Sequence, residues 1–197
     1  MCTLRFRMKK VRAKVTMSSQ IGISYTTPMN PIQIIRDADI GSDIPAPDSY
    51  RERTSARAIV FNADGKVAIL HATKKNFHKL PGGGVEEGED LPTALARELQ
   101  EEIGCSAKNI RELAVVEEYR NKYALHHTSH CFLAELDGEV GPTAMDESEI
   151  AVGFVTEWMN LSDAVQKIES ETEFESYQWK FIRLRELAFL KEAVRIV

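Results

Sequence analysis

The chain has 197 residues, of which 43% are hydrophobic and 28% are charged. This length suits one domain, or one domain with an arm, and the apolar content excludes a chain that is disordered throughout. No apolar run reaches about 18 residues, so the sequence predicts no membrane span. The net charge of −5 argues against a protein that coats nucleic acid, so we expect no stable nucleic-acid binding.

The charges are unevenly distributed along the chain. Residues 1–20 hold six basic residues and no acidic one, whereas residues 83–105 hold seven acidic residues and one basic residue. The net charge of this second segment, −6, exceeds that of the whole chain. The acidic segment therefore requires a physical explanation.

The three cysteines, Cys2, Cys105 and Cys131, are too few and too widely spaced for a disulfide framework or a metal pair. We therefore expect a reduced, cytoplasmic location. Residues 1–20 lack the apolar centre of a secretory signal. Their basic composition loosely fits organellar targeting, and the alternatives are a mobile tail, a tag remnant or an upstream start codon.

Residues 41–50 contain glycine, serine and two prolines, which predicts an irregular segment. We therefore divide the chain into a partly irregular N-terminal arm, 1–49, and one domain, 50–197. The sequence contains no internal repeat that would divide the domain further.

The domain combines short β-type runs with helical patterns. Strands are predicted at 56–61, 66–71, 110–120, 123–136 and 151–159. The Asp64-Gly65 turn indicates that the first two form a hairpin. Helices are predicted at 91–103, with Asp90 as N-cap and Gly104 as stop, at 161–170 and at 177–194. This mixed order favours an α/β or α+β sandwich.

The helix at 91–103 carries most of the acidic segment. Its apolar stripe consists of Leu91, Leu95, Leu99 and Ile103. Glu98, Glu101 and Glu102 lie at i, i+3 and i+4, so they are neighbours on a face that overlaps the edge of this stripe. Their mutual repulsion would be relieved by a divalent cation, and oxygen ligands suit Mg²⁺ or Mn²⁺. We favour this metal site over a solvated acidic face.

A glycine-rich segment, 81–84, precedes the helix and is predicted to be a loop. It is not a phosphate-binding Walker loop, because Glu89 and Asp90 stand where that motif requires lysine and then serine or threonine. We interpret it as flexible backbone that brings a carbonyl close to the cation.

Together these features form a defined pattern: Gly83-x5-Glu89-x7-Arg97-Glu98-Leu99-x-Glu101-Glu102-x-Gly104-Cys105. The pattern resembles the Nudix box, G-x5-E-x7-R-E-U-x-E-E-x-G-U, in which U is apolar. The preceding Leu80-Pro81-Gly82 and the later Trp158 also resemble this family, and the resemblance covers about residues 50–195.

The resemblance implies an α/β/α sandwich with a mixed central sheet and a Mg²⁺-dependent hydrolase of nucleoside diphosphates linked to another group. It implies that Glu98, Glu101, Glu102 and the carbonyl of Gly82 bind metal. It further implies that Arg97 orients Glu98 and that Glu89 braces the junction of loop and helix, with Gly83 and Gly104 as structural positions of the motif.

The resemblance leaves the general base open between Glu98 and a carboxylate on a later loop. Residues 146–149 are that loop, and we choose Glu149 first and Glu147 second, with a solvated acidic loop as the alternative. Such a base would accept a proton from the attacking water.

Three further residues are candidate substrate contacts. Tyr123 would stack on a base, although a strand residue is the simpler interpretation. Arg57 and Lys79 flank the site and would meet phosphates. On a strand, His126 and His130 would share one face, and His127 and Cys131 would share the other. These side chains cannot converge on one ion, so we expect no zinc site there.

The leading hypothesis is an enzyme that hydrolyses a small-molecule nucleotide, such as a modified nucleoside triphosphate. Dinucleoside polyphosphates and ADP-ribose remain open as substrates, and so does a homodimer as the oligomeric state. The alternatives of other classes are a non-catalytic nucleotide sensor and an isomerase of isoprenoid diphosphates.

Overall fold

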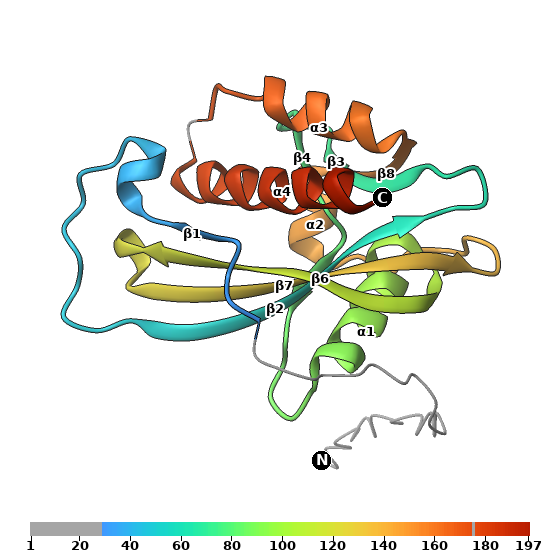
Figure 1. The fold of residues 1–197 in the computed structure, drawn as a ribbon, viewed down its shortest axis with the longest axis horizontal. Helices are drawn as coiled ribbons and strands as arrows, with labels where there is room; N and C mark the ends of the chain where they lie inside the picture. The colour runs from blue at the N-terminus through green and yellow to red at the C-terminus, as the bar shows by residue number, and fades with distance from the viewer. Residues whose placement is uncertain (1–28, 175) are drawn as a thin grey trace, which may run out of the picture.

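The computed structural model describes residues 29–174 and 176–197, so the basic segment 1–20 lies outside the described residues. The described strands form one eight-stranded sheet, and three of the four α-helices, α1, α3 and α4, cover its two faces (Figure 1). The strands are β1 (Gln33–Ile35), β2 (Arg51–Phe61), β3 (Val67–Ala72), β4 (Phe77–Lys79), β5 (Gly82–Gly84), β6 (Ser106–Arg120), β7 (Leu125–Asp137) and β8 (Phe154–Met159). The helices are η1 (Asp37–Ile40), α1 (Leu91–Ile103), η2 (Asn121–Tyr123), α2 (Glu147–Val152), α3 (Leu161–Ser170) and α4 (Tyr177–Ile196).

The sheet is mixed. Its strand order is β1-β6-β7-β2-β3-β4, with β5 added to β2 and β8 added to β3. The pairs β1–β6 and β2–β7 are parallel, and the other pairs are antiparallel. The predicted hairpin is confirmed, because β2 pairs with β3 across the Asp64-Gly65 turn.

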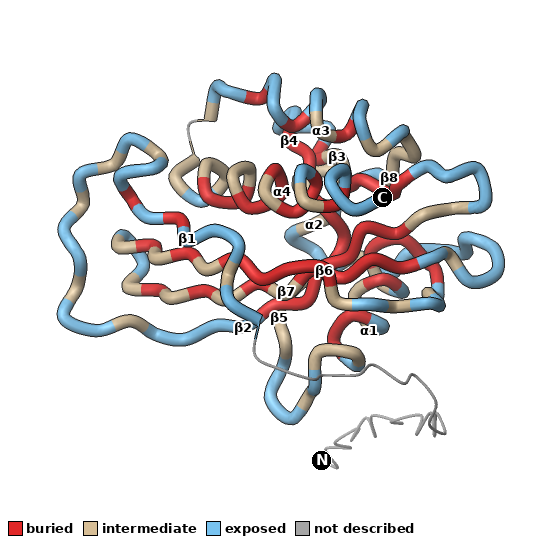
Figure 2. Tube along the Cα trace, in the orientation of Figure 1, coloured by how far each residue is buried: buried red, intermediate tan, exposed pale blue. Residues whose placement is uncertain are grey.

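The faces of the sheet are covered by different helices. Alternate residues of β2 separate accordingly: Ile59 packs with the core that includes α3 and α4, and Val60 packs with the core that includes α1. Buried residues therefore run through the centre of the sheet and along the inner side of α4 (Figure 2). These layers confirm the predicted α/β/α sandwich.

Two predictions about local structure were wrong. The predicted loop at 81–84 contains strand β5, because β2 offers these glycines an antiparallel partner. The predicted loop 146–149 and the start of the predicted strand at 151 form α2, because Asp146 and Glu149 make a capping box that begins a helix.

Residues before position 50 contribute to the same sheet. The strand β1 lies parallel to β6, and Asp37, in η1 directly after it, accepts hydrogen bonds from the hydroxyl of Tyr177 and the amide of Asn121. The division of the chain at residue 50 remains a prediction, and these contacts tie the end of the arm to both β6 and α4.

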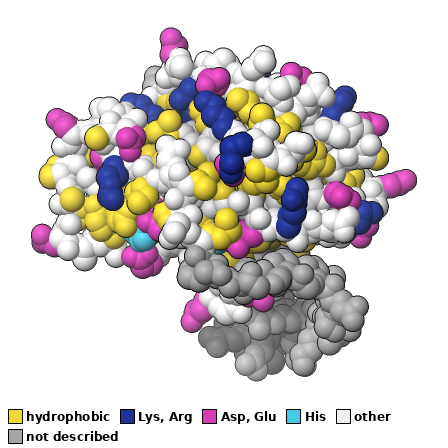
Figure 3. Space-filling model, in the orientation of Figure 1, with side chains coloured by type: hydrophobic (Ala, Val, Ile, Leu, Met, Phe, Trp, Pro, Cys, Tyr) yellow, Lys and Arg dark blue, Asp and Glu magenta, His cyan; other side chains and the backbone are white. Residues whose placement is uncertain are grey.

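Three further observations concern the described residues. Cys105 and Cys131 are free and buried. In the part of the chain that the structure describes, no helix is long and apolar enough to cross a membrane. On the face that carries α4, basic side chains lie among apolar ones, and most acidic side chains lie towards the outline (Figure 3).

Candidate active site

The helix α1 positions three glutamates at the edge of the sheet. Asp90 caps the helix by accepting a hydrogen bond from the amide of Thr93, and Gly104 ends it in the left-handed conformation, with φ of 64°. Leu95 and Leu99 bury one side of the helix against the sheet. This packing draws the neighbouring glutamates out of water to different degrees.

The three glutamates differ in exposure. The side chains of Glu98, Glu101 and Glu102 are 13%, 41% and 1% exposed, respectively. Burial raises the pKa of Glu98, and the negative charge of Glu102 raises it further, while Arg97 opposes both effects. The structure thus brings together the acids that the sequence grouped, with Glu98 and Glu102 in a partly dry environment.

The strand β5 lies directly against these acids. The amide of Gly82 donates a hydrogen bond to Oε2 of Glu102. A Cβ atom on Gly83 would overlap the carboxylate of Glu98, so any larger residue here would have to displace that carboxylate. Gly82, whose φ is 120°, is likewise confined by the backbone of Ala56.

Arg97 links the helix to the glycine strand. Its Nε and Nη2 donate to the two carboxylate oxygens of Glu89 at 2.9 and 3.0 Å, and Nη2 also donates to the carbonyl of Gly84 at 2.9 Å. Its Nη1 lies 2.9 Å from Glu98 and 3.2 Å from Glu101. One guanidinium therefore fixes Glu89, Glu98 and β5 relative to each other.

Glu149 of α2 joins this group from a distant part of the chain. Its Oε1 atom lies 3.9 Å from Nζ of Lys79, and the same Nζ lies 2.6 Å from Oε1 of Glu102. Burial raises the pKa of Glu149 to about 7, and the proximity of Glu102 contributes to this rise. We call Glu98, Glu101, Glu102 and Glu149 the carboxylate cluster.

Arg57 is buried, at 7% exposed, beneath the glycine strand. Its guanidinium donates to the carbonyl of Gly82, which is the predicted metal ligand, and reaches the carbonyl of Leu80 at 3.4 Å. The guanidinium of Arg57 thus faces main-chain oxygens, and the substrate contact of Arg57 stays a prediction.

The remaining predicted site residues have other surroundings. Tyr123 lies in η2 and packs edge-on against Tyr177, with ring centroids 5.4 Å apart. Glu147 is exposed on α2. The strand histidines do alternate: His127 is buried, while His126 and His130 lie on the other face and pair with separate glutamates.

Sequence reasoning missed Arg53 as a neighbour of the site. A Cβ atom on Gly84 would lie 3.0 Å from Nη2 of Arg53, so this guanidinium lies over the glycine strand. The alternation of Arg51, Arg53 and Arg57 along β2 places all three on one face, and this period of two was the available signal.

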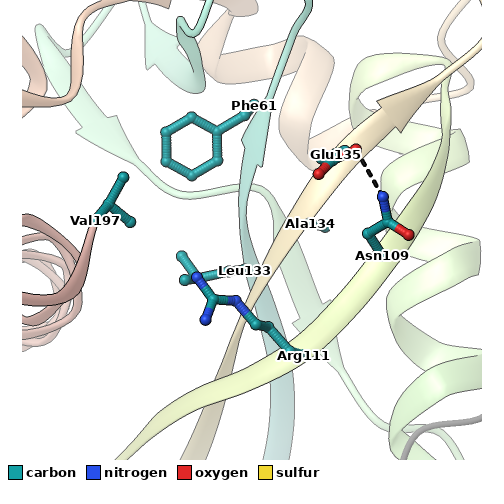
Figure 4. A pocket seen from close by; sticks show the side chains of 7 residues that line it. All are labelled: Phe61, Asn109, Arg111, Leu133, Ala134, Glu135 and Val197. Atoms are coloured by element: carbon teal, nitrogen blue, oxygen red, sulfur yellow. Dashed lines mark hydrogen bonds between the residues drawn. The ribbon is translucent and has the colours of Figure 1, made fainter.

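A separate pocket of about 220 Å³ lies between the C-terminal residue and strands β2, β6 and β7 (Figure 4). None of the site residues predicted from the sequence lines it. Its lining residues are Phe61, Asn109, Arg111, Leu133, Ala134, Glu135 and Val197.

Comparisons with known proteins add to this geometry. The model of the NUDIX domain matches residues 51–184. An RNA pyrophosphohydrolase of Actinobacillus pleuropneumoniae serotype 3 is 28% identical over 140 residues, which cover 67% of this chain and 60% of that protein. A CMP-5'-(N-acetyl-N-hydroxy-3-aminopropyl)phosphonate hydrolase of Streptomyces rubellomurinus is 30% identical over 125 residues, 60% of this chain and 57% of that protein. These matches thus span less than two thirds of the length of either relative.

Among solved structures, the solution structure of the E. coli ORF135 protein has a TM-score of 0.52 and 18% identity, and the match covers 77% of this chain and 95% of that chain. At this identity the likeness concerns the fold alone. It shows that the described sandwich has a known fold. The chemistry has to be argued from the residues of the site.

Proposed function

This chain belongs to the NUDIX domain family, and from that premise we propose that it hydrolyses a diphosphate bond in a nucleotide, with Mg²⁺ as cofactor and Mn²⁺ as the alternative. One observation carries the proposal. Glu98 and Glu102 lie as a partly desolvated like-charge pair against the glycine strand β5, and burial with mutual repulsion raises the pKa of Glu98. Arg97 and Lys79 offset this repulsion only in part, since the pKa of Glu98 stays raised, and a divalent cation would relieve it further.

The proposed metal ligands are carboxylate oxygens of Glu98, Glu101 and Glu102 together with the carbonyl oxygen of Gly82. All are hard oxygen donors, which Mg²⁺ prefers. The Gly82 carbonyl accepts from Arg57, but a carbonyl oxygen has a second lone pair. When bound, Mg²⁺ would neutralise diphosphate oxygens and lower the pKa of a water molecule.

The residues around the ligands would hold them in place. Arg97 binds Glu89 through two nitrogens and reaches Glu98, so it would keep this carboxylate at the glycine strand. The absence of side chains on β5 would let a diphosphate approach its backbone. Arg53 lies over β5 and Lys79 lies within the cluster, so both are candidates to contact substrate phosphates.

We propose Glu149 as the general base. It is half-buried on α2, and its pKa of about 7 suits a group that accepts a proton near neutral pH. Its side chain shares Lys79 with Glu102, so the base would lie beside the proposed metal ligands. Glu98 is the alternative base that the family resemblance leaves open.

The substrate proposal is a small-molecule nucleotide, with a modified nucleoside triphosphate, a dinucleoside polyphosphate and ADP-ribose as members of the class. A second candidate is the diphosphate linkage of an RNA, because the match to an RNA pyrophosphohydrolase covers 67% of this chain. Arg51 and Arg53, exposed side by side on one face of β2, would suit the phosphates of a longer chain.

The test is a panel of these nucleotides and a short 5′-triphosphorylated RNA, assayed for release of phosphate or pyrophosphate with Mg²⁺ and with chelator. We expect Mg²⁺-dependent hydrolysis that falls by orders of magnitude in E101Q and E102Q but persists in E87Q, whose side chain is exposed outside the cluster. If no nucleotide is hydrolysed and one raises the melting temperature, the protein is a nucleotide sensor. Unchanged turnover in E101Q would contradict the metal assignment.

A further inference from the structure

A second group of metal-ligating side chains lies on three strands outside the carboxylate cluster. His71 on β3, His78 on β4 and Glu157 on β8 each offer one donor atom, and these atoms all lie within 4.8 Å of one another. The imidazole rings stack with centroids 4.1 Å apart and planes inclined by 13°. We call these three residues the histidine site.

The hydrogen bonds of His78 define which of its nitrogen atoms is free. The ring is fully buried, and Nδ1 is bound by the carboxylate of Glu171, which also accepts the His78 main-chain amide at 3.3 Å. In the neutral ring, Nδ1 donates its hydrogen to Glu171 and Nε2 then carries a lone pair. This buried Nε2 has no hydrogen-bond partner in the described part of the chain.

The lone pair of His78 faces another acceptor. Its Nε2 lies 3.6 Å from Oε2 of Glu157, whose other oxygen lies 2.7 Å from Nδ1 of His71. A buried nitrogen lone pair opposite a carboxylate is unfavourable unless a proton or a metal cation lies between them. The Nε2 of His71 is also buried without a partner. The site therefore holds more donor and acceptor capacity than the protein itself satisfies.

We propose that His71, His78 and Glu157 bind one Zn²⁺ ion. Zinc takes imidazole nitrogen and carboxylate oxygen at about 2.0–2.2 Å, which separates tetrahedral ligand atoms by roughly 3.3 Å. The distances of 2.7 and 3.6 Å from the Glu157 oxygens to the two rings bracket this value. Two histidines and one carboxylate leave a fourth position for water.

The surroundings of the histidine site fit a metal ligand set. Glu171 holds His78 as an outer carboxylate holds a zinc-binding histidine, fixing both the tautomer and the ring orientation. The side chains of Glu157 and His71 are 38% and 18% exposed, so the ion has access from solvent. The ligands are mainly nitrogen, which separates this site chemically from the oxygen ligands of the carboxylate cluster.

The test is a Zn²⁺ titration of the full-length, metal-free protein by calorimetry, with saturating Mg²⁺ present to occupy the carboxylate cluster. We expect one Zn²⁺ per chain, and with Co²⁺ in its place we expect visible absorption typical of low coordination number. H71Q and E157Q should each weaken binding at least tenfold, and E171Q by about 10–100-fold. H130Q is the matched control, because His130 is also a part-buried strand histidine paired with a glutamate, and it should bind as the wild type.

H71Q and E157Q are the informative variants because these side chains are partly exposed, and circular dichroism without metal will show that they fold. Nitrogen-15 spectra of the imidazoles supply a second measurement: Zn²⁺ should shift Nε2 of His78. Equal Zn²⁺ binding by the wild type and by both variants would overturn the proposal. A doubly protonated His78 that does not respond to Zn²⁺ would also overturn it, because a proton would then join the ring to Glu157.

Discussion

The Nζ of Lys79 lies 2.6 Å from Oε1 of Glu102, and this glutamate is the most buried of the three on α1, at 1% exposed. The lysine thus supplies a positive charge to a carboxylate that we propose as a metal ligand. Removing one member of a buried ion pair leaves the other without compensation.

The first prediction concerns this pair. K79M should lower the free energy of unfolding by about 3 kcal/mol without metal, because Glu102 then stays buried without its partner. Saturating Mg²⁺ should recover part of the loss. Urea denaturation with and without Mg²⁺ measures both effects, with K66M at an exposed turn as the control. Equal stability of K79M and wild type without metal would contradict the view that Lys79 compensates the buried charge of Glu102.

A second prediction concerns the geometry of Arg97. R97K keeps the charge but loses the two-nitrogen contact with Glu89, so Glu98 should be less well positioned. We expect kcat to fall by about 100-fold with a retained fold. R111K, a substitution at the pocket of Figure 4, is the control, and a change in KM alone would show that Arg97 acts on substrate binding instead.

A third prediction concerns the space beside Gly83. In G83A the new Cβ would overlap the carboxylate of Glu98 and displace it. Activity should fall by about 100-fold, since small displacements of reacting groups have effects of this size. G141A is the matched control, because its nearest contact would be 3.4 Å from a carbonyl oxygen. Full activity in G83A would show that the position of Glu98 is not critical.

A fourth prediction separates the two candidate bases on α2. E149Q should lower kcat by about 10²–10⁴-fold, which is the usual contribution of general base catalysis. E147Q should have a far smaller effect, because Glu147 is exposed whereas Glu149 lies beside Lys79 and Glu102. Steady-state kinetics of both variants decide the ranking, and the reverse order would assign the base to Glu147.

A fifth prediction concerns stability at acidic pH. Burial lowers the pKa of His127 to about 4, although Glu118 opposes the shift, whereas in the unfolded chain its value is 6.5. The unfolded state then binds more protons, so stability is complete above about pH 6.5 and is lost as the pH falls towards 4. The loss should reach about 3 kcal/mol. Chemical denaturation across this range should show a shallower slope in H127Q, and an identical slope would contradict the prediction.

The sequence predicted the elements whose signals are local. Asp90 and Gly104 define both ends of α1, and the spacing of its leucines defines which side is buried. The same helical geometry grouped Glu98, Glu101 and Glu102. These features depend on neighbours within a few residues, so the chain alone contains them.

Features that depend on distant partners could not be predicted in this way. The glycines of β5 form a strand only because β2 is available to pair with them. Lys79 meets Glu102 across 23 positions, and His71 meets Glu157 across 86 positions. The sequence contains each residue of the histidine site, but only the sheet brings together three strands that are separate along the chain.

The short strand β1 has a consequence for solubility. It covers residues 116–118 of β6, which would otherwise be an uncovered stretch of hydrogen-bonding backbone at the border of the sheet. Uncovered strands of this kind recruit strands from other molecules. The strand β1 is itself the outer strand at this border, and its three residues, held in place by the contact of Asp37 with Tyr177, offer other molecules a much shorter template than β6 would.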